Sequence, residues 1–172
     1  TLDFMHVTLS GADLEKFEND FGDLIQLNKD SSHIPTSRIL EIVLAGAYKL
    51  RTSDIHFEPF KDSVRLRYRI DGILQEVGTL PIAVYQLAIS RVKMMGKMKI
   101  NVRNKSQDGH FSVELGEHHI DIRVNIIPGN YGESVNMRLL TGEEAFVAVE
   151  ELGLRGRAFD EVKRATEKPN GM

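Results

Sequence analysis

The stretch HHIDIRVNIIPGNYGESVNMRLL, residues 118–140, alternates apolar and polar side chains on both sides of a turn at 128–132. Its apolar residues recur at every second position and are Ile120, Ile122, Val124, Ile126, Val135, Met137 and Leu139. This period predicts a β-hairpin with one apolar and one polar face. With the hairpin centred near Asn130, Arg123 and Arg138 become close to direct cross-strand partners on the polar face. Like charges so placed are mildly destabilising unless a negative group lies between them, so we expect an anion there.

The composition limits how that anion could be bound. The chain has 172 residues, enough for one domain with its own core and some appendages. Its formal net charge of −3 gives no global attraction for nucleic acid, so anion binding must be local. The absence of cysteine excludes a disulfide scaffold and a thiolate metal site. No apolar run approaches the roughly 18 residues that a membrane span needs.

The pattern of the chain indicates three regions. Residues 1–31 are predicted to form a short strand, a helix and a linker that leads from a preceding domain. Residues 32–141 predict a helix, three strands, a second helix and three further strands, which is an α+β domain on a mostly antiparallel sheet. Residues 142–172 contain an apolar patch and a predicted helix at 157–166. Because the chain begins with Thr1, we expect it to be a piece of a longer protein.

Periodicity and turn signals define the elements of the middle region. Helical spacing predicts helices at about 35–51 and 82–97, the second ending near lysines that suit the negative end of the helix dipole. Strands are predicted in the segments SDIHFEPF, SVRLRYRID and GILQEVG and at residues 110–116, 118–127 and 133–140. Asp71-Gly72 predicts a tight hairpin turn, because such turns need positive φ. Gln107-Asp108-Gly109 predicts a further turn.

The segment SVRLRYRID carries a stripe of three arginines, Arg65, Arg67 and Arg69, on the face opposite its apolar residues. One interpretation is a solvated sheet face that is partly neutralised by the nearby carboxylates Glu58, Glu76 and Asp71. The other is an anion-binding surface, since the planar guanidinium fork matches phosphate and carboxylate. The sequence leaves both interpretations open.

Asp54, His56 and Glu58 alternate along one predicted strand and form a chemically acceptable set of metal ligands. Side chains on one face of a strand stand about 7 Å apart, which is long for a single ion. Surface hydrogen bonding explains the pattern as well, so we expect no metal site.

Sequence motifs of known catalytic sites are absent from the chain. It has neither a G-x-x-x-x-G-K-[ST] phosphate loop nor a G-x-G-x-x-G fingerprint nor a G-x-S-x-G nucleophile turn. We therefore expect these residues to be inactive by themselves and to offer positive charge to an anion held partly by another domain.

The order of several motifs resembles the secretion ATPase superfamily, specifically its type II secretion and type IV pilus assembly ATPases. The motifs are SDIHFEP, VRLRYRIDGIL, SRVKMMGKMKI, QDGHF, DIRVNIIPGNYGESVNMRLL, LGL and KPNGM, collinear from about Pro35 to Met172. The resemblance implies that 32–141 is the second N-terminal domain, a PAS-like domain with a five- or six-stranded antiparallel sheet flanked by helices. It also implies that 142–172 is a linker and the start of a RecA-like ATPase domain, with the Walker A motif beyond Met172.

The same resemblance implies a function and its residues. Such proteins are homo-hexameric cytoplasmic ATPases, peripheral at the inner membrane, that drive pilin or pseudopilin assembly through a membrane platform protein and other assembly proteins, without nucleic acid. The N-terminal domain closes over ATP and Mg²⁺ held mainly by the RecA-like domain. Matched by motif, Arg123 and Arg138 would be arginine fingers to the ATP phosphates. Further candidates for nucleotide or subunit contacts are Arg67, Arg69, Arg91 and Arg103. His110 stands where the family commonly has arginine.

Two alternatives belong to other classes. A PAS-like sensor or interaction module could bind an acidic ligand or partner on the arginine face without hydrolysis. An RNA-binding sheet is disfavoured, because the polar face lacks the interleaved aromatic residues on which bases stack. The sequence does not separate pilus extension from type II secretion or competence.

Overall fold

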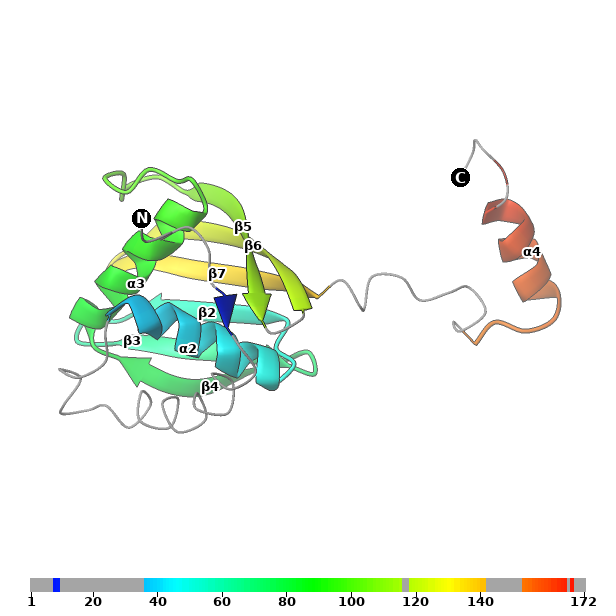
Figure 1. Cartoon of the computed structure of the whole chain (residues 1–172), viewed down its shortest axis with the longest axis horizontal. Helices are drawn as coiled ribbons and strands as arrows, with labels where there is room; N and C mark the ends of the chain where they lie inside the picture. Colours follow the sequence, from blue (N-terminus) through cyan, green and yellow to red (C-terminus); the bar gives the residue numbers. More distant parts are fainter. Residues whose placement is uncertain (1–7, 10–35, 116–117, 142–152, 167, 169–172) are drawn as a thin grey trace. The chain divides into compact units, whose positions relative to one another are not determined.

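The computed structural model of the chain describes residues 8–9, 36–115, 118–141, 153–166 and 168 (Figure 1). The chain divides into two compact units, Thr1–Thr141 and Gly142–Met172. The helix predicted within residues 1–31 and the apolar patch predicted after 142 lie outside the described residues. Among the helices that are described, none is both long and apolar enough to cross a membrane.

A seven-stranded sheet forms the body of the first unit, in the order β1-β5-β6-β7-β2-β3-β4. The strands are β1 (Thr8–Leu9), β2 (Asp54–Pro59), β3 (Val64–Ile70), β4 (Ile73–Leu80), β5 (Gln107–Leu115), β6 (His118–Gly129) and β7 (Gly132–Thr141). Strands β2 to β7 pair only in antiparallel fashion, and the two-residue β1 adds a parallel edge beside β5. The predicted α+β class and mostly antiparallel sheet are confirmed.

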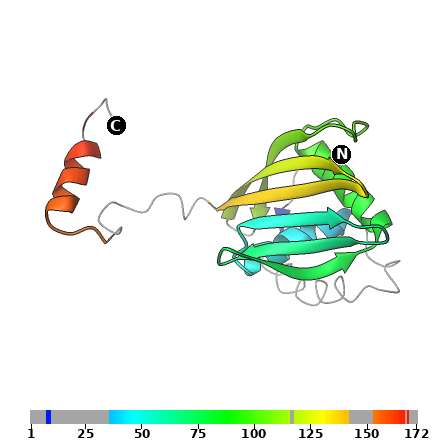
Figure 2. The same cartoon turned by 180° about the vertical axis from the view of Figure 1, so that it is seen from behind.

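Two helices, α2 (Thr36–Lys49) and α3 (Ile82–Met95), cover the same face of this sheet (Figures 1 and 2). Their inward residues include Leu40, Val43, Val92 and Met95, all buried against the apolar side of the strands. The polar side of the strands faces away from both helices, which lie behind the sheet in the view of Figure 2. We call this side the open face.

The hairpin of β6 and β7 has the predicted faces and register. Ile120, Ile122, Val124 and Ile126 are buried, whereas the intervening His119, Asp121 and Arg123 are exposed. Gly129 pairs with Gly132, which leaves a two-residue turn at 130–131, and Arg123 pairs directly with Arg138. The Asp71-Gly72 turn is confirmed as well, since φ is 49° at Asp71 and 77° at Gly72.

The turn predicted at Gln107-Asp108-Gly109 is wrong, because β5 begins at Gln107, which pairs with Ile126. Gly109 instead allows the backbone of β5 to pass close to the backbone of Gly96. A Cβ atom there would lie 2.6 Å from the carbonyl oxygen of Gly96, just beyond α3. The side-chain amide of Gln107 accepts from the Lys99 N–H at 2.8 Å and donates to the Val102 carbonyl at 2.9 Å. Glycine and amide side chain together close the loop between α3 and β5.

The second unit contains α4 (Arg157–Thr166), with the predicted bounds. An ion pair one helical turn apart, Arg157 Nε to Glu161 Oε1 at 2.8 Å, lies on its surface. The described residues of α4 are mostly exposed within this unit.

Replacing Gly109 with alanine should destabilise the first unit. The added methyl group cannot fit beside the Gly96 carbonyl oxygen without shifting backbone, and overpacking of this kind costs about 1–3 kcal/mol. Urea unfolding of the chain, followed by circular dichroism, measures the change. The matched control is Gly72→Asn, because asparagine tolerates positive φ and nothing lies within 4 Å of a Cβ atom at 72. Equal unfolding midpoints for Gly109→Ala and the unchanged chain would contradict the close-approach role.

Candidate functional site

A transverse row of polar side chains crosses the open face. It contains one residue from each of β3, β2, β7, β6 and β5, and its members in that order are Arg69, Asp54, Arg138, Arg123 and His110. Each residue is the direct cross-strand partner of the next, and alternation puts all five on the same side of the sheet. We call this set the arginine row.

Asp54 is the buried member of the arginine row, with 6% of its side chain exposed. Its Oδ1 atom accepts a hydrogen bond from Nε of Arg138 at 2.9 Å, and its Oδ2 atom lies 3.2 Å from Nε of Arg69. The Ser53 hydroxyl donates to Oδ2 at 3.0 Å. The carboxylate is therefore held between guanidinium groups from the two strands that flank β2.

The electrostatic surroundings keep Asp54 ionised. Burial by itself raises the pKa of this carboxyl group, but several groups oppose it. Hydrogen bonds from Arg138 and Ser53 and the positive charges of Arg138 and Arg69 outweigh burial, so the pKa of Asp54 lies below its usual value.

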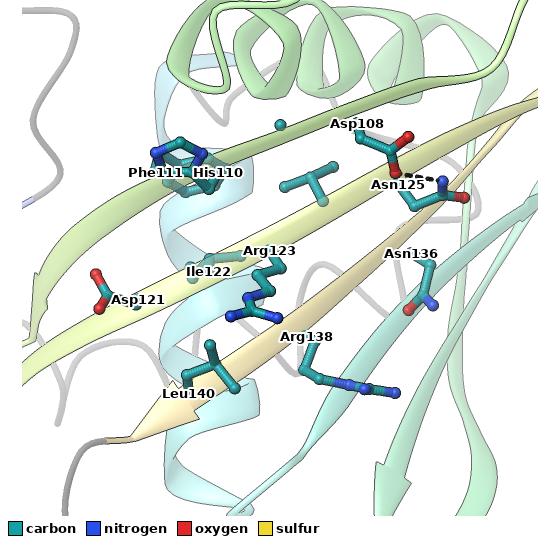
Figure 3. Close-up of a pocket in the computed structure, with 12 residues that line it drawn as sticks. Asp108, His110, Phe111, Asp121, Ile122, Arg123, Asn125, Asn136, Arg138 and Leu140 are labelled. Atoms are coloured by element: carbon teal, nitrogen blue, oxygen red, sulfur yellow. Dashed lines mark hydrogen bonds between the residues drawn. The ribbon is translucent and has the colours of Figure 1, made fainter. Parts of the chain in front are cut away.

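Within the arginine row, Arg123 is the arginine that has no partner among the described residues. It is exposed, and among the described residues it makes no hydrogen bond or ion pair. Figure 3 shows Arg123 and Arg138 side by side on adjacent strands, with guanidinium groups that point to different sides. The anion expected between the two arginines is not supplied by Asp54, which contacts Arg138 from β2, on the side away from β6. The space beside Arg123 is open to an external anion.

An open hollow of about 750 Å³ lies over this part of the sheet. Its lining includes Arg123, Arg138 and His110 together with the carboxylates of Asp108 and Asp121 (Figure 3). Both carboxylates are engaged locally. Asp108 Oδ1 accepts from the side-chain amide of its β6 partner at 2.7 Å, and Asp121 Oδ1 accepts from the hydroxyl of its β5 partner at 2.6 Å. The two carboxylates keep their negative charge, and the guanidinium groups of Arg123 and Arg138 are the hydrogen-bond donors that suit an anion with several oxygens.

The arginine stripe of β3 is neutralised within the sheet. Arg65 Nε lies 3.0 Å from Glu76 Oε2, and Arg67 forms an ion pair with Glu58. Arg69 pairs with Asp54, so Asp54 takes the place that the sequence interpretation gave to Asp71. The interpretation of a neutralised sheet face therefore describes the contacts of this stripe.

The remaining candidate arginines lie apart from the hollow. Arg91 of α3 contacts Glu41 of α2 at 2.9 Å, between the two helices. Arg103 follows α3 and lines a separate cavity of about 130 Å³ near the turn of the β6–β7 hairpin. Of the seven arginines named in the sequence analysis, only Arg123 and Arg138 line the hollow.

Sequence reasoning missed a buried ion pair beside the hairpin turn. Lys93 Nζ lies 2.7 Å from Glu133 Oε1, and their side chains are only 2% and 9% exposed. Lys93 also donates to the Val102 carbonyl at 2.8 Å, and the Tyr85 hydroxyl donates to the Glu133 carbonyl. The signal was present, because Lys93 lies one helical turn after the buried Ile89. The sequence pattern alone favours an interaction of these lysines with the helix dipole.

Asp54, His56 and Glu58 of β2 do not act together as metal ligands, because both carboxylates form ion pairs with arginines. Asp54 holds two arginines and Glu58 holds a third. Burial lowers the pKa of His56, a shift that Asp54 and Glu58 oppose and that Arg69 and Arg67 reinforce. Throughout the described part of the chain, no three His, Asp or Glu side chains are grouped so as to hold a metal ion.

The stability of the first unit should depend on the charge of Asp54. Because the folded pKa lies below the usual 3.8, the carboxylate stabilises the fold above that value, and this contribution is lost as the pH falls through the folded pKa. We expect the difference in unfolding free energy between the unchanged chain and Asp54→Asn to be largest above about pH 5 and to shrink towards about pH 2.

Urea titrations across this pH range measure that difference. Asp71→Asn, in the exposed turn between β3 and β4, is the control for removing a surface carboxylate. A difference that stays constant from neutral to acidic pH would contradict the assigned role of the Asp54 charge.

Known proteins resemble the chain over most of its length. The family described as Type II/IV secretion system protein matches residues 29–172. The chain is 35% identical over 150 residues to "Type II secretion system protein E" of Xanthomonas campestris pv. campestris, covering 87% of the chain and 26% of that protein. It is 32% identical over 174 residues to "Type IV pilus assembly ATPase PilB" of Myxococcus xanthus, covering 94% and 31%. For "Type II secretion system ATPase E" of Vibrio cholerae the identity is 33% over 150 residues, covering 87% and 29%. The chain therefore spans less than a third of the length of each of these relatives.

Proposed function

The chain belongs to the type II/IV secretion system protein family, and from this premise we propose that it is an N-terminal domain of a secretion or pilus-assembly ATPase. In this proposal the open face closes over ATP that is bound mainly by a RecA-like domain elsewhere in the full-length protein. The names of the relatives, which include ATPases of both systems, support the activity.

The observation that carries the proposal is the pair of adjacent arginines at the hollow. Arg123 and Arg138 are direct cross-strand partners, and both line the same open space. Arg138 is 63% exposed although its Nε atom is bound to Asp54. Two guanidinium groups on neighbouring strands can donate several hydrogen bonds to one phosphoryl group. That arrangement suits the terminal phosphate of ATP better than a ligand with a single charge.

The chemistry proposed for the pair is charge stabilisation. In phosphoryl transfer, negative charge spreads over the oxygens of the transferred group in a loose transition state. Arg123 and Arg138 would donate to these oxygens as arginine fingers, and the like charges that face each other on the hairpin would be balanced by the phosphate. Mg²⁺ would be held mainly by residues of the RecA-like domain and would supply further positive charge to the phosphates.

Hydrolysis would change the contact between the two domains. While the γ-phosphate is present, both arginines hold the N-terminal domain against the nucleotide. After hydrolysis and phosphate release that attraction is lost, and the domains can separate. We propose that this opening and closing works within a homo-hexamer at the cytoplasmic side of the inner membrane. The motion would pass to a membrane platform protein and drive pilin or pseudopilin assembly.

Removal of either arginine from the full-length protein should abolish most ATP hydrolysis. We expect Arg123→Ala and Arg138→Ala to lower kcat by about 10³-fold or more, as arginine fingers do in related chemistry, while ATP still binds. Steady-state hydrolysis and binding of a fluorescent ATP analogue measure the two effects separately.

The matched control is Arg65→Ala. Arg65 lies on the open face of β3, pairs with Glu76 and is absent from the lining of the hollow. If Arg123→Ala and Arg138→Ala both hydrolyse ATP at the wild-type rate, this face has no role in hydrolysis. That result would favour a sensor or interaction module that binds an acidic ligand.

A further inference from the structure

We propose that Asp54 is a positioning residue for Arg138, a role that rests on the proposed function of this arginine. The buried carboxylate binds Nε of Arg138 at 2.9 Å and so holds the guanidinium group on the β2 side of its strand, while Arg138 still lines the hollow. The terminal guanidinium nitrogens of Arg138 make no hydrogen bond or ion pair within the described residues and remain available for phosphate oxygens.

The geometry around Asp54 is that of a rigid anchor. The residue lies on β2 between β7 and β3, and its side chain is 6% exposed. Each carboxylate oxygen faces a different arginine, Oδ1 towards Arg138 and Oδ2 towards Arg69. The Ser53 hydroxyl adds a bond at 3.0 Å. A carboxylate with three partners has little freedom to turn.

A rigid anchor matters because Arg138 is long and largely exposed. A free arginine samples many rotamers, and ordering it at the moment of reaction costs entropy. Binding through Nε selects a small set of these rotamers before the nucleotide arrives. Placement of a catalytic group is demanding, since an error of about 1 Å can cost roughly 100-fold in rate. Asp54 supplies this placement without touching the nucleotide.

Asp54 also makes the positive charge of the arginine row uneven, because it neutralises part of the charge at Arg69 and Arg138 and leaves that of Arg123 unpaired. Its negative charge is shared by Arg69 and Arg138, whereas Arg123 has no partner among the described residues. An incoming anion is therefore drawn towards Arg123 and the exposed side of Arg138. Arg69 does not line the hollow. Arg69 therefore contributes by holding the Asp54 carboxylate in place and does not contact the nucleotide.

A neighbouring ion pair provides a matched control. Glu58 lies on the same strand and the same face as Asp54, and it pairs with Arg67 as Asp54 pairs with Arg69. Neither Glu58 nor Arg67 lines the hollow. Glu58→Gln therefore removes an equivalent carboxylate from β2 without affecting Arg138.

Steady-state kinetics of the full-length protein test the proposal in four variants: Asp54→Asn, Glu58→Gln, Arg138→Ala and the double variant Asp54→Asn/Arg138→Ala. We expect Asp54→Asn to lower kcat by about 10- to 100-fold with KM for ATP changed less than about 3-fold. Glu58→Gln should stay within about 2-fold of wild type. The double variant should be no slower than Arg138→Ala alone, because Asp54 acts only through Arg138.

Three results would overturn the positioning role. The first is a wild-type kcat in Asp54→Asn, and the second is a decrease in kcat in Glu58→Gln as large as that in Asp54→Asn. The third is a double variant whose kcat falls by the product of the two single-variant factors. If Arg138→Ala is slow while Asp54→Asn is normal, the positioning role fails and the arginine-finger function stands. If Arg138→Ala hydrolyses normally, the finger function itself fails.

A second variant keeps the test valid if Asp54→Asn does not fold. Asp54→Glu retains the charge for both arginines but lengthens the side chain by one methylene, which moves Arg138 by about 1 Å. Circular dichroism and the urea midpoint establish folding. The proposal then predicts a kcat at least about 10-fold below wild type in a folded protein, and an unchanged kcat overturns it.

Discussion

The register between β6 and β7 is the constraint on which the rest of the site depends. Burial of Ile120, Ile122 and Val124 fixes which side of β6 faces the helices, and a slip of one residue would move all of them to solvent. Each such side chain gains about 1.5–3 kcal/mol from burial, so a slipped register is strongly disfavoured. The core thereby forces Arg123 and Arg138 into a direct pair on the opposite side.

Two buried carboxylates then hold the hairpin in place from different directions. Asp54 binds Arg138 on the open face, and Glu133 binds Lys93 of α3 near the turn. The Lys93–Glu133 pair is buried on both sides and adds little net stability when its desolvation is counted, but losing one partner would leave an uncompensated buried charge and cost about 3–5 kcal/mol. In the Asp54–Arg138 pair only the carboxylate is buried. The main effect of the two ion pairs is on geometry rather than on stability. Both pairs restrict how the hairpin and its arginines can move relative to the sheet and to α3.

The sequence predicted what depends on local periodicity and missed what depends on strand neighbours. Alternation along 118–140 was long enough to fix the faces and register of the hairpin. The dipeptide Asp71-Gly72 identified a second turn, and φ is positive at both residues in the structure. The partner of Arg138 could not be found in this way. Asp54 lies 84 residues earlier in the chain, and periodicity gives the face of a strand without saying which strand lies beside it.

Two local signals were misleading for a related reason. Gly109 resembles a turn residue in sequence, yet it permits the backbone of β5 to pass close to Gly96. Lys93 resembles a helix-end cation, yet it pairs with the carboxylate of Glu133 on β7. In both cases the residue is explained by a segment that is distant in sequence or belongs to another element. Such contacts appear only once the sheet order is known.

We propose that Arg123 and Arg138 together receive the γ-phosphate of ATP. The most direct measurement is a structure of the full-length protein bound to Mg²⁺ and a non-hydrolysable ATP analogue. We expect nitrogens of both guanidinium groups within about 2.7–3.2 Å of γ-phosphate oxygens, with Asp54 still bound to Nε of Arg138. A closed nucleotide site in which both arginines face solvent, or contact only protein carboxylates, would contradict it.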